Sequence, residues 1–216
     1  EYNAISIRGE MEWWLSIILD RAKNDGVSLV INAVGYTGTP NVDACEDNKR
    51  ECLSVNVILA EKIANICKVL DLPLIHVSSG CIYKSFSGYA YDLTKEHIPE
   101  IPFRFKEEDI PNFSFEQGNS GSWYSGTKAL AESIVRKTWD KTYICRLRMP
   151  FNHIDEDKNY ISKIIKYPKV WSANNSLTNI DEFVKVCYEL AQTGEYGTYN
   201  ITNPGGITAK EILEIA

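Results

Sequence analysis

Short apolar stretches and helical patterns alternate along the first two thirds of this chain. Three stretches rich in β-branched residues, at residues 29–31, 74–77 and 143–145, predict short buried strands. A helix between the first two strands is predicted by five apolar residues at helical spacing: Leu53, Val57, Ala60, Ala64 and Cys67.

A second helix, which opens at Tyr124, separates the second strand from the third. Its apolar stripe consists of Leu130, Ala131, Ile134 and Val135. Strands that alternate with helices in this rhythm predict a parallel sheet with helices on both faces. The fold class is therefore α/β, with a doubly wound parallel sheet.

Beyond residue 150 the pattern is less regular, and the elements are shorter. The predicted elements are a helix near residues 159–166, a strand near 169–171, a helix over 180–192 and a strand over 198–201.

Residues 80–122 show no sustained periodicity and contain Pro99, Pro102 and Pro111. Loops of this length are uncommon inside a compact domain and are usually functional or disordered. This segment also follows the end of a predicted strand, where open α/β sheets bind their ligands. We therefore predict a lid or a substrate-binding loop.

The chain also lacks a feature that a dinucleotide-binding sheet normally carries. Such a domain begins with a strand and a Gly-rich turn whose backbone amides hold the pyrophosphate, and no G-x-G-x-x-G pattern occurs here. The last residues, 214–216, lie in a helix that has only just begun. We expect a fragment cut at both ends; the alternative is a fold that binds no dinucleotide.

Composition narrows the class of protein further. Of 216 residues, 44% are apolar and 24% charged, as in a soluble globular protein, and no apolar run approaches the ~20 residues of a membrane span. Residues 1–10 lack the blocks of a signal peptide. A formal charge of −6 argues against nucleic acid as the main partner.

The six cysteines contain no C-x-x-C pair, and most lie in apolar helix or strand patterns. This usage indicates a reduced, cytoplasmic protein without a disulfide framework or a metal site.

Tyr124 and Lys128 are the first candidates for chemistry. Side chains four residues apart on a helix face the same way, and a nearby ammonium favours the phenolate form of tyrosine. The sequence therefore predicts a phenol with a lowered pKa, able to donate a proton to a carbonyl oxygen. Tyr91 and Lys95 share this spacing, but no apolar stripe follows them, so we interpret them as loop residues. The alternative for Tyr124 and Lys128 is a helix start with a solvated lysine.

The strand at residues 74–77 continues into Ser78-Ser79-Gly80, where a serine hydroxyl can meet the same carbonyl oxygen as the Tyr124 hydroxyl. Ser79, Tyr124 and Lys128 together resemble the catalytic triad of the extended short-chain dehydrogenase/reductase superfamily. That resemblance implies a Rossmann-like domain over residues 1–150, without its first strand and Gly-rich turn, and a partial substrate-binding region over residues 151–216.

The same resemblance extends to the cofactor side. Asn32, Ala33, Val34 and Gly35 resemble the superfamily's N-A-A-G stretch beside the adenosine, and Asn56 resembles an asparagine that braces the site. The alternative for Asn56 is a polar residue at a helix edge.

Longer blocks resemble one branch of the superfamily, the UDP-4-keto-6-deoxyglucose 3,5-epimerase/4-reductases that make UDP-rhamnose. These blocks are residues 32–46, 80–83, 105–113, 146–150 and 200–213. They occur in order and cover most of the chain, and the Lys-Glu-Glu-Asp and Arg-x-Arg-Met-Pro blocks are not general to the superfamily. The missing Gly-rich turn and the long loop before Tyr124 depart from that pattern.

That branch implies more than the triad. Inverting C3 and C5 of a 4-keto sugar requires two acid/base groups that flank the ring, and the resemblance assigns them to Cys81 and Lys163. Read alone, Cys81 would be a strand-end filler and Lys163 a solvated helix lysine. Met149 and Pro150 would border the nicotinamide, and Tyr124 and Lys128 would also contact the cofactor. That cofactor is NADPH, with NADH as the alternative.

Three rival functions remain open at this point. A GDP-4-keto-6-deoxymannose epimerase/reductase would pair Cys81 with a histidine, for which His153 is the candidate. A dTDP-4-dehydrorhamnose reductase would need neither Cys81 nor Lys163. A non-catalytic, dinucleotide-binding regulatory subunit would keep the fold without turnover. The resemblance favours a UDP-4-keto-6-deoxy sugar as substrate, and leaves open a homodimer and a fused or separate dehydratase.

Overall fold

A four-stranded parallel sheet forms the centre of the chain in a computed structural model, which describes residues 11–84, 104–116, 121–170 and 173–215. Its strands lie in the order β1-β2-β3-β7, and every neighbouring pair is parallel. Their bounds are β1 Val30–Asn32, β2 Leu74–Ser79, β3 Thr142–Leu147 and β7 Gly197–Asn200. All four predicted strands of the sheet are therefore confirmed, and β2 extends two residues further than predicted.

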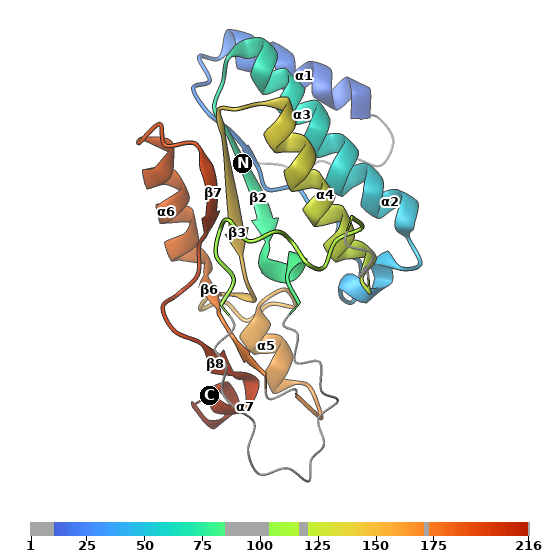
Figure 1. Cartoon of the computed structure of the whole chain (residues 1–216), viewed down its shortest axis with the longest axis vertical. Coiled ribbons are helices and arrows are strands. Elements are labelled where there is room, and N and C mark those ends of the chain that lie inside the picture. The colour runs from blue at the N-terminus through green and yellow to red at the C-terminus, as the bar shows by residue number, and fades with distance from the viewer. Residues whose placement is uncertain (1–10, 85–103, 117–120, 171–172, 216) are drawn as a thin grey trace.

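Helices cover both faces of the sheet, as the strand–helix rhythm predicted. Figure 1 shows α1 (Met11–Asn24), α3 (Leu59–Leu70) and α4 (Trp123–Thr138) on one side, and α6 (Ile180–Ala191) on the other. Successive strand residues serve the two faces in turn: Leu74 packs in the core beneath α3 and α4, and Ile75 packs in the core beneath α6. The doubly wound α/β fold is confirmed. The sequence patterns did not predict α1.

The helix predicted from residue 53 to residue 67 is continuous but not uniform. It consists of α2 (Lys49–Leu53), a π-helical segment η2 (Ser54–Ile58) and α3. The widened turn places Asn56 inward, with an exposed fraction of 1%. Single π turns inside helices occur frequently at functional sites.

The C-terminal part adds two small two-stranded sheets and two short helices below the main sheet (Figure 1). One sheet is parallel and the other antiparallel. The elements are β4 Pro150–Phe151, α5 Tyr160–Ile165, β5 Asn174–Asn175, β6 Thr178–Asn179, β8 Ile207–Thr208 and α7 Ala209–Ile215.

The helices predicted at residues 159–166 and 180–192 correspond to α5 and α6 and are confirmed. The strand predicted near residues 169–171 is wrong for Lys169 and Val170, which lie in irregular structure, and residue 171 is outside the described part. The nearby strand is instead β5, whose two residues pair with β8 more than thirty positions away. Local preference does not encode such distant pairing.

Much of the long segment between β2 and α4 lies outside the described residues, including Tyr91 and Lys95. Its described parts hold to the sheet end: the Tyr83 and Phe105 rings stack at 4.4 Å, and the Phe113 amide donates to the Ile82 carbonyl oxygen. The prediction of a lid remains a prediction.

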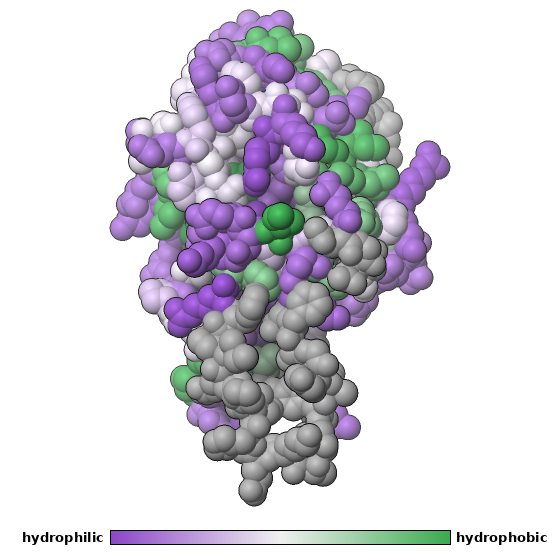
Figure 2. Space-filling view, in the orientation of Figure 1, coloured by the Kyte–Doolittle hydropathy of each residue, from purple (hydrophilic) through white to green (hydrophobic). Residues whose placement is uncertain are grey.

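Outside the residues drawn in grey, Figure 2 shows hydrophilic, intermediate and apolar residues mixed over this face. Within the described ranges, no helix combines the length and apolar character that a membrane crossing requires.

Candidate functional site

The carboxyl ends of β1 and β2 and the first turns of α4 meet at one edge of the sheet. Ser79 is the last residue of β2, and Tyr124 and Lys128 lie in the first two turns of α4. The Ser122 side chain caps that helix by accepting a hydrogen bond from the Ser125 amide at 3.3 Å. This edge is where parallel α/β sheets bind ligands.

Ser79 and Tyr124 lie close together. Both side chains are buried, with exposed fractions of 5% and 8%, and the Ser79 side chain is near enough to the phenol to influence the pKa of Tyr124. Burial raises the pKa of Tyr124 well above its usual value, the nearby Cys81 raises it further, and the Ser79 side chain lowers it in part. The expected lowering of this pKa by Lys128 is therefore wrong for this structure, because desolvation outweighs every favourable contact.

Lys128 is buried beside them, with an exposed fraction of 4%. Its Nζ donates to the Val77 carbonyl oxygen at 2.9 Å. Burial lowers the pKa of Lys128 to about 8, and the Glu132 carboxylate opposes that shift. The alternative of a solvated lysine is excluded.

Asn56 fastens two parts of this edge together. Its Nδ2 donates to the Tyr36 carbonyl oxygen and to Thr127 Oγ1, both at 3.1 Å, and its Oδ1 accepts from the Tyr36 amide at 2.7 Å. Asn56 thus connects the segment after β1 to α4. No sequence pattern pointed to Tyr36 or Thr127, because only the fold brings them to Asn56.

The backbone from Asn32 to Gly35, at the end of β1, is held by hydrogen bonds of Asn32. Asn32 is buried, its Nδ2 lies 3.1 Å from His76 Nδ1, and its Oδ1 accepts from the Val34 amide at 3.2 Å. Ala33, Val34 and Gly35 are exposed at this edge. They are therefore accessible to a ligand that lies across the strand ends.

Cys81 lies in a short turn, η3 (Gly80–Ile82), directly after β2. It is half-buried and packs in a cluster that contains Tyr124. Its backbone amide donates to Ser79 Oγ at 3.2 Å, and its Sγ accepts from Arg148 Nη1 at 3.1 Å. The structure thus brings Ser79, Cys81, Tyr124 and Lys128 together.

Lys163 is connected to this group less directly. It lies half-buried on α5, one turn after Tyr160. Burial raises the pKa of Tyr160, and the charge of Arg148 opposes that shift, so this helix face lies near Arg148. Among the described residues, no hydrogen bond joins Lys163 to Cys81.

Met149 and Pro150 follow the end of β3. Met149 has a φ of 44°, a left-handed conformation that is uncommon outside glycine and that concentrates at functional sites. Pro150 pairs with Thr178 in the parallel β4–β6 sheet.

A buried ion pair, which the sequence patterns did not predict, joins the helix of the site to the sheet. Glu132 of α4 accepts from Arg146 of β3, with a shortest distance of 2.7 Å between Oε2 and Nη2, and from the Ser78 hydroxyl. Arg146 Nη1 also donates to the Tyr83 hydroxyl at 2.8 Å. The pair fixes the helix that carries Tyr124 and Lys128 to the sheet. Glu132 lies four residues after Lys128, on the same helix face, and this spacing was the signal available.

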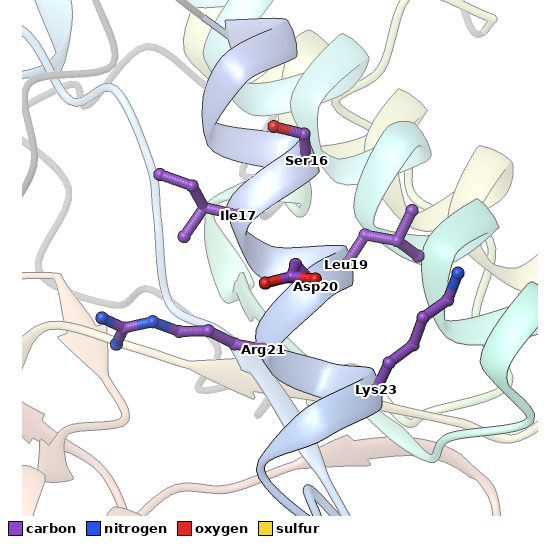
Figure 3. A pocket seen from close by; sticks show the side chains of 6 residues that line it. All are labelled: Ser16, Ile17, Leu19, Asp20, Arg21 and Lys23. Atoms are coloured by element: carbon purple, nitrogen blue, oxygen red, sulfur yellow. The ribbon is translucent and has the colours of Figure 1, made fainter.

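A surface hollow along α1 takes no part in this arrangement. Figure 3 shows the side chains that line it, all from one helix: Ser16, Ile17, Leu19, Asp20, Arg21 and Lys23. None of them belongs to the triad.

Comparison with known families gives one match over most of the chain. A family model described as the RmlD substrate binding domain matches residues 15–208.

Two curated proteins of Arabidopsis thaliana are similar to the chain. It is 38% identical over 209 residues to a trifunctional UDP-glucose 4,6-dehydratase/UDP-4-keto-6-deoxy-D-glucose 3,5-epimerase/UDP-4-keto-L-rhamnose-reductase, over 96% of this chain and 29% of that protein. It is 40% identical over 189 residues to a bifunctional dTDP-4-dehydrorhamnose 3,5-epimerase/dTDP-4-dehydrorhamnose reductase, over 87% of this chain and 58% of that protein. The chain therefore spans less than two thirds of either relative.

Two crystal structures share the fold. The L780 UDP-rhamnose synthase from Acanthamoeba polyphaga mimivirus has a TM-score of 0.77 and 26% identity, over 93% of this chain and 67% of that one. A dTDP-4-dehydrorhamnose reductase from Bacillus anthracis, in complex with NADP, has a TM-score of 0.71 and 18% identity, over 93% and 66%. The second likeness concerns the fold alone.

Proposed function

The chain belongs to the family of RmlD substrate-binding domains, and on that premise we propose that it inverts C3 and C5 of UDP-4-keto-6-deoxyglucose and then reduces C4 with NADPH. The product is UDP-rhamnose. The observation that carries the proposal is the position of Cys81, whose sulfur lies in the same cluster as the Tyr124 phenol, directly after Ser79. A reductase without epimerase activity does not require a thiol at that position.

In the reduction, the hydroxyl groups of Ser79 and Tyr124 bind the ketone oxygen, and Tyr124 protonates it. Because the two side chains lie close together, both can donate to the oxygen of a C4 ketone, and Tyr124 gives up its proton as that oxygen becomes an alkoxide. Its raised pKa keeps the phenol protonated at neutral pH, and an alkoxide is basic enough to take the proton. Lys128, with a pKa near 8, carries a positive charge beside this centre at neutral pH.

The residues at the strand ends are suited to the nicotinamide side of a dinucleotide. The Lys128 ammonium has three N–H donors, and Val77 is its one acceptor among the described residues, so two donors are available for ribose hydroxyls. Ala33, Val34 and Gly35 are exposed after the end of β1, and Asn56 holds the next residue, Tyr36. We assign Met149 and Pro150 to the border of the nicotinamide. Bound NADPH supplies the hydride for C4, and NADH is the alternative donor.

Epimerisation uses groups on the two faces of the sugar ring. In a gluco-configured ring the hydrogens at C3 and C5 project from the same face, so one base there and one acid on the opposite face serve both carbons. We assign these groups to Cys81 and Lys163. Ser79 and Tyr124 hold the enolate oxygen at C4 between the two inversions.

The nucleotide of the substrate is assigned by comparing UDP, dTDP and GDP sugars. UDP is favoured by the Arabidopsis relative that is similar over 96% of this chain, and a dTDP sugar is the second candidate because the other relative carries that name. A GDP sugar is disfavoured, since His153 has 80% of its side chain exposed and lies 3.8 Å from Asp181 rather than beside Cys81. A non-catalytic subunit is disfavoured because all three triad residues meet.

The two parts of the chain have different roles in this proposal. Residues 1–150 would hold the cofactor, and residues 151–216 would contribute to sugar binding. A dehydratase, fused or separate, would supply the 4-keto sugar, as the name of one relative includes that activity. We place the protein in the cytoplasm, where its six free cysteines stay reduced.

Incubation of the full-length protein with UDP-4-keto-6-deoxyglucose and NADPH in deuterated water tests this function. We expect UDP-rhamnose that carries deuterium at C3 and C5. The dTDP and GDP sugars, run in parallel, decide the nucleotide. A reduced product without ring deuterium would remove the epimerase from the proposal.

A further inference from the structure

Arg148 reaches the Cys81 sulfur from the end of the neighbouring strand. It follows the last residue of β3, and its backbone amide is held by Thr178 Oγ1 at 2.9 Å. One arm of its guanidinium, Nη1, donates to Cys81 Sγ at 3.1 Å, and the other, Nη2, donates to Asn175 Oδ1 at 2.8 Å.

The stem of Arg148 is also fixed. A Cβ added to Gly80 would lie 3.4 Å from Arg148 Cδ, so the aliphatic part of the side chain runs in contact with the residue before Cys81. Asn175 is held in turn, since its Nδ2 donates to the Ala173 carbonyl oxygen at 3.1 Å and its strand β5 pairs with β8. The guanidinium therefore has little freedom to leave the sulfur.

In this contact Arg148 is the hydrogen-bond donor and the Cys81 sulfur is the acceptor. Arginine carries only donors and stays charged at every relevant pH, so the sulfur must be the acceptor. A thiolate is a far better acceptor than a thiol, and cationic neighbours are what favours thiolates in reactive cysteines. Among the described residues, Arg148 is the one cation with a hydrogen bond to this sulfur.

We propose that Arg148 is a positioning residue for Cys81: it holds the sulfur toward the sugar and stabilises the thiolate, which makes Cys81 the base and Lys163 the acid. This inference rests on the proposed epimerase function and goes beyond it, since it divides the two roles and adds a residue to the machinery.

At each carbon the thiolate is the base and the ammonium is the acid. The Cys81 thiolate takes the proton, and the C–H electron pair moves into the enolate, whose oxygen Ser79 and Tyr124 hold. The Lys163 ammonium gives a proton to the opposite face of the same carbon, and the pair becomes a thiol and a neutral amine. Exchange with solvent restores both groups before the second inversion, so solvent deuterium enters at each carbon. Arg148 gives up no proton in this cycle.

Alkylation of Cys81 by iodoacetamide at one fixed pH tests the electrostatic part. In the full-length protein, peptide mass spectrometry follows alkylation at Cys81 separately from every other cysteine, and the other five cysteines of this chain are buried. Arg148→Gln should slow alkylation about tenfold, the effect of losing one close opposite charge, and Arg148→Lys should restore part of the rate. Arg50→Gln, which removes an exposed arginine on α2, is the matched control and should alkylate at the wild-type rate.

Two rates of turnover separate positioning from general structural damage. Deuterium exchange into UDP-4-keto-6-deoxyglucose should fall at least about tenfold in Arg148→Gln. Reduction of the already epimerised UDP-4-keto-rhamnose should stay within about threefold of wild type, because Cys81 takes no part in it. Asn175→Ala, which frees only the second arm of the guanidinium, should slow alkylation and deuterium exchange by smaller factors and leave the reduction unchanged.

Wild-type protein without exchange would refute the proposed epimerase itself. Wild-type exchange together with unchanged alkylation and exchange in Arg148→Gln would overturn the role of Arg148 alone. If Arg148→Gln does not fold, Arg148→Lys and Asn175→Ala decide: wild-type values in both would overturn the proposal, and reduced values with intact reduction would support it.

Discussion

Lys128 donates from Nζ to the Val77 carbonyl oxygen at 2.9 Å, so α4 is fastened to β2 two residues before Ser79. The bond fixes the distance between the strand that carries the serine and the helix that carries the tyrosine. It also holds an ammonium in a buried place, where burial lowers the pKa of Lys128 from 10.5 to about 8. The same lysine thus serves the geometry and the charge of the site.

That lowered pKa predicts a pH dependence of stability. Between pH 8 and 10.5 the unfolded chain binds the Lys128 proton more tightly than the folded chain does, so the free energy of unfolding gains a contribution that rises with pH. Relative to Lys128→Met, the wild-type protein should gain on the order of 3 kcal/mol across this window, from 1.36 kcal/mol per pKa unit. Urea unfolding of both proteins at pH 7, 8, 9 and 10 measures the difference. A difference that is flat or falls with pH would contradict the buried position of Lys128.

Glu132→Gln should destabilise the protein strongly. The change leaves the Arg146 guanidinium buried without its carboxylate, and breaking a buried pair in this way costs about 3–5 kcal/mol. Glu189→Gln is the matched control, because its pair with Lys185 is exposed and contributes at most about 0.5 kcal/mol. Equal urea midpoints for the two variants would show that Glu132 and Arg146 are not buried together.

Asn56→Ala should loosen the edge of the sheet. The substitution leaves the Tyr36 amide and carbonyl without their partner, and we expect a loss of about 1–3 kcal/mol in the free energy of unfolding, together with a lower kcat. Asn65→Ala, on the exposed side of the following helix, removes one exposed hydrogen bond to Glu61 and should leave both quantities nearly unchanged. Should Asn56→Ala match that control, Asn56 is only a polar residue at a helix edge.

The strands of the central sheet could be predicted because β-branched runs at residues 74–77 and 143–145 are buried on both faces. The strands β4, β5, β6 and β8 could not, since each has two residues and depends on a partner that is distant in sequence. Motif spacing likewise located Ser79, Cys81, Tyr124 and Lys128. It did not identify Arg148, whose role is defined by contacts with β5 and η3, and it predicted the wrong direction for the pKa of Tyr124, because spacing contains no measure of burial.

Cys81→Ala gives the most direct test of the central claim, that a thiol beside the Ser79–Tyr124 pair makes this site an epimerase as well as a reductase. Full-length wild type, Cys81→Ala and the buried-cysteine control Cys67→Ala would be compared in deuterated water. Two readouts are needed: ring deuterium in UDP-4-keto-6-deoxyglucose, and NADPH-dependent reduction of UDP-4-keto-rhamnose. We expect Cys81→Ala to lose exchange by about a hundredfold or more while it retains reduction, and Cys67→Ala to retain both. Exchange that persists in Cys81→Ala at the wild-type rate would contradict the account.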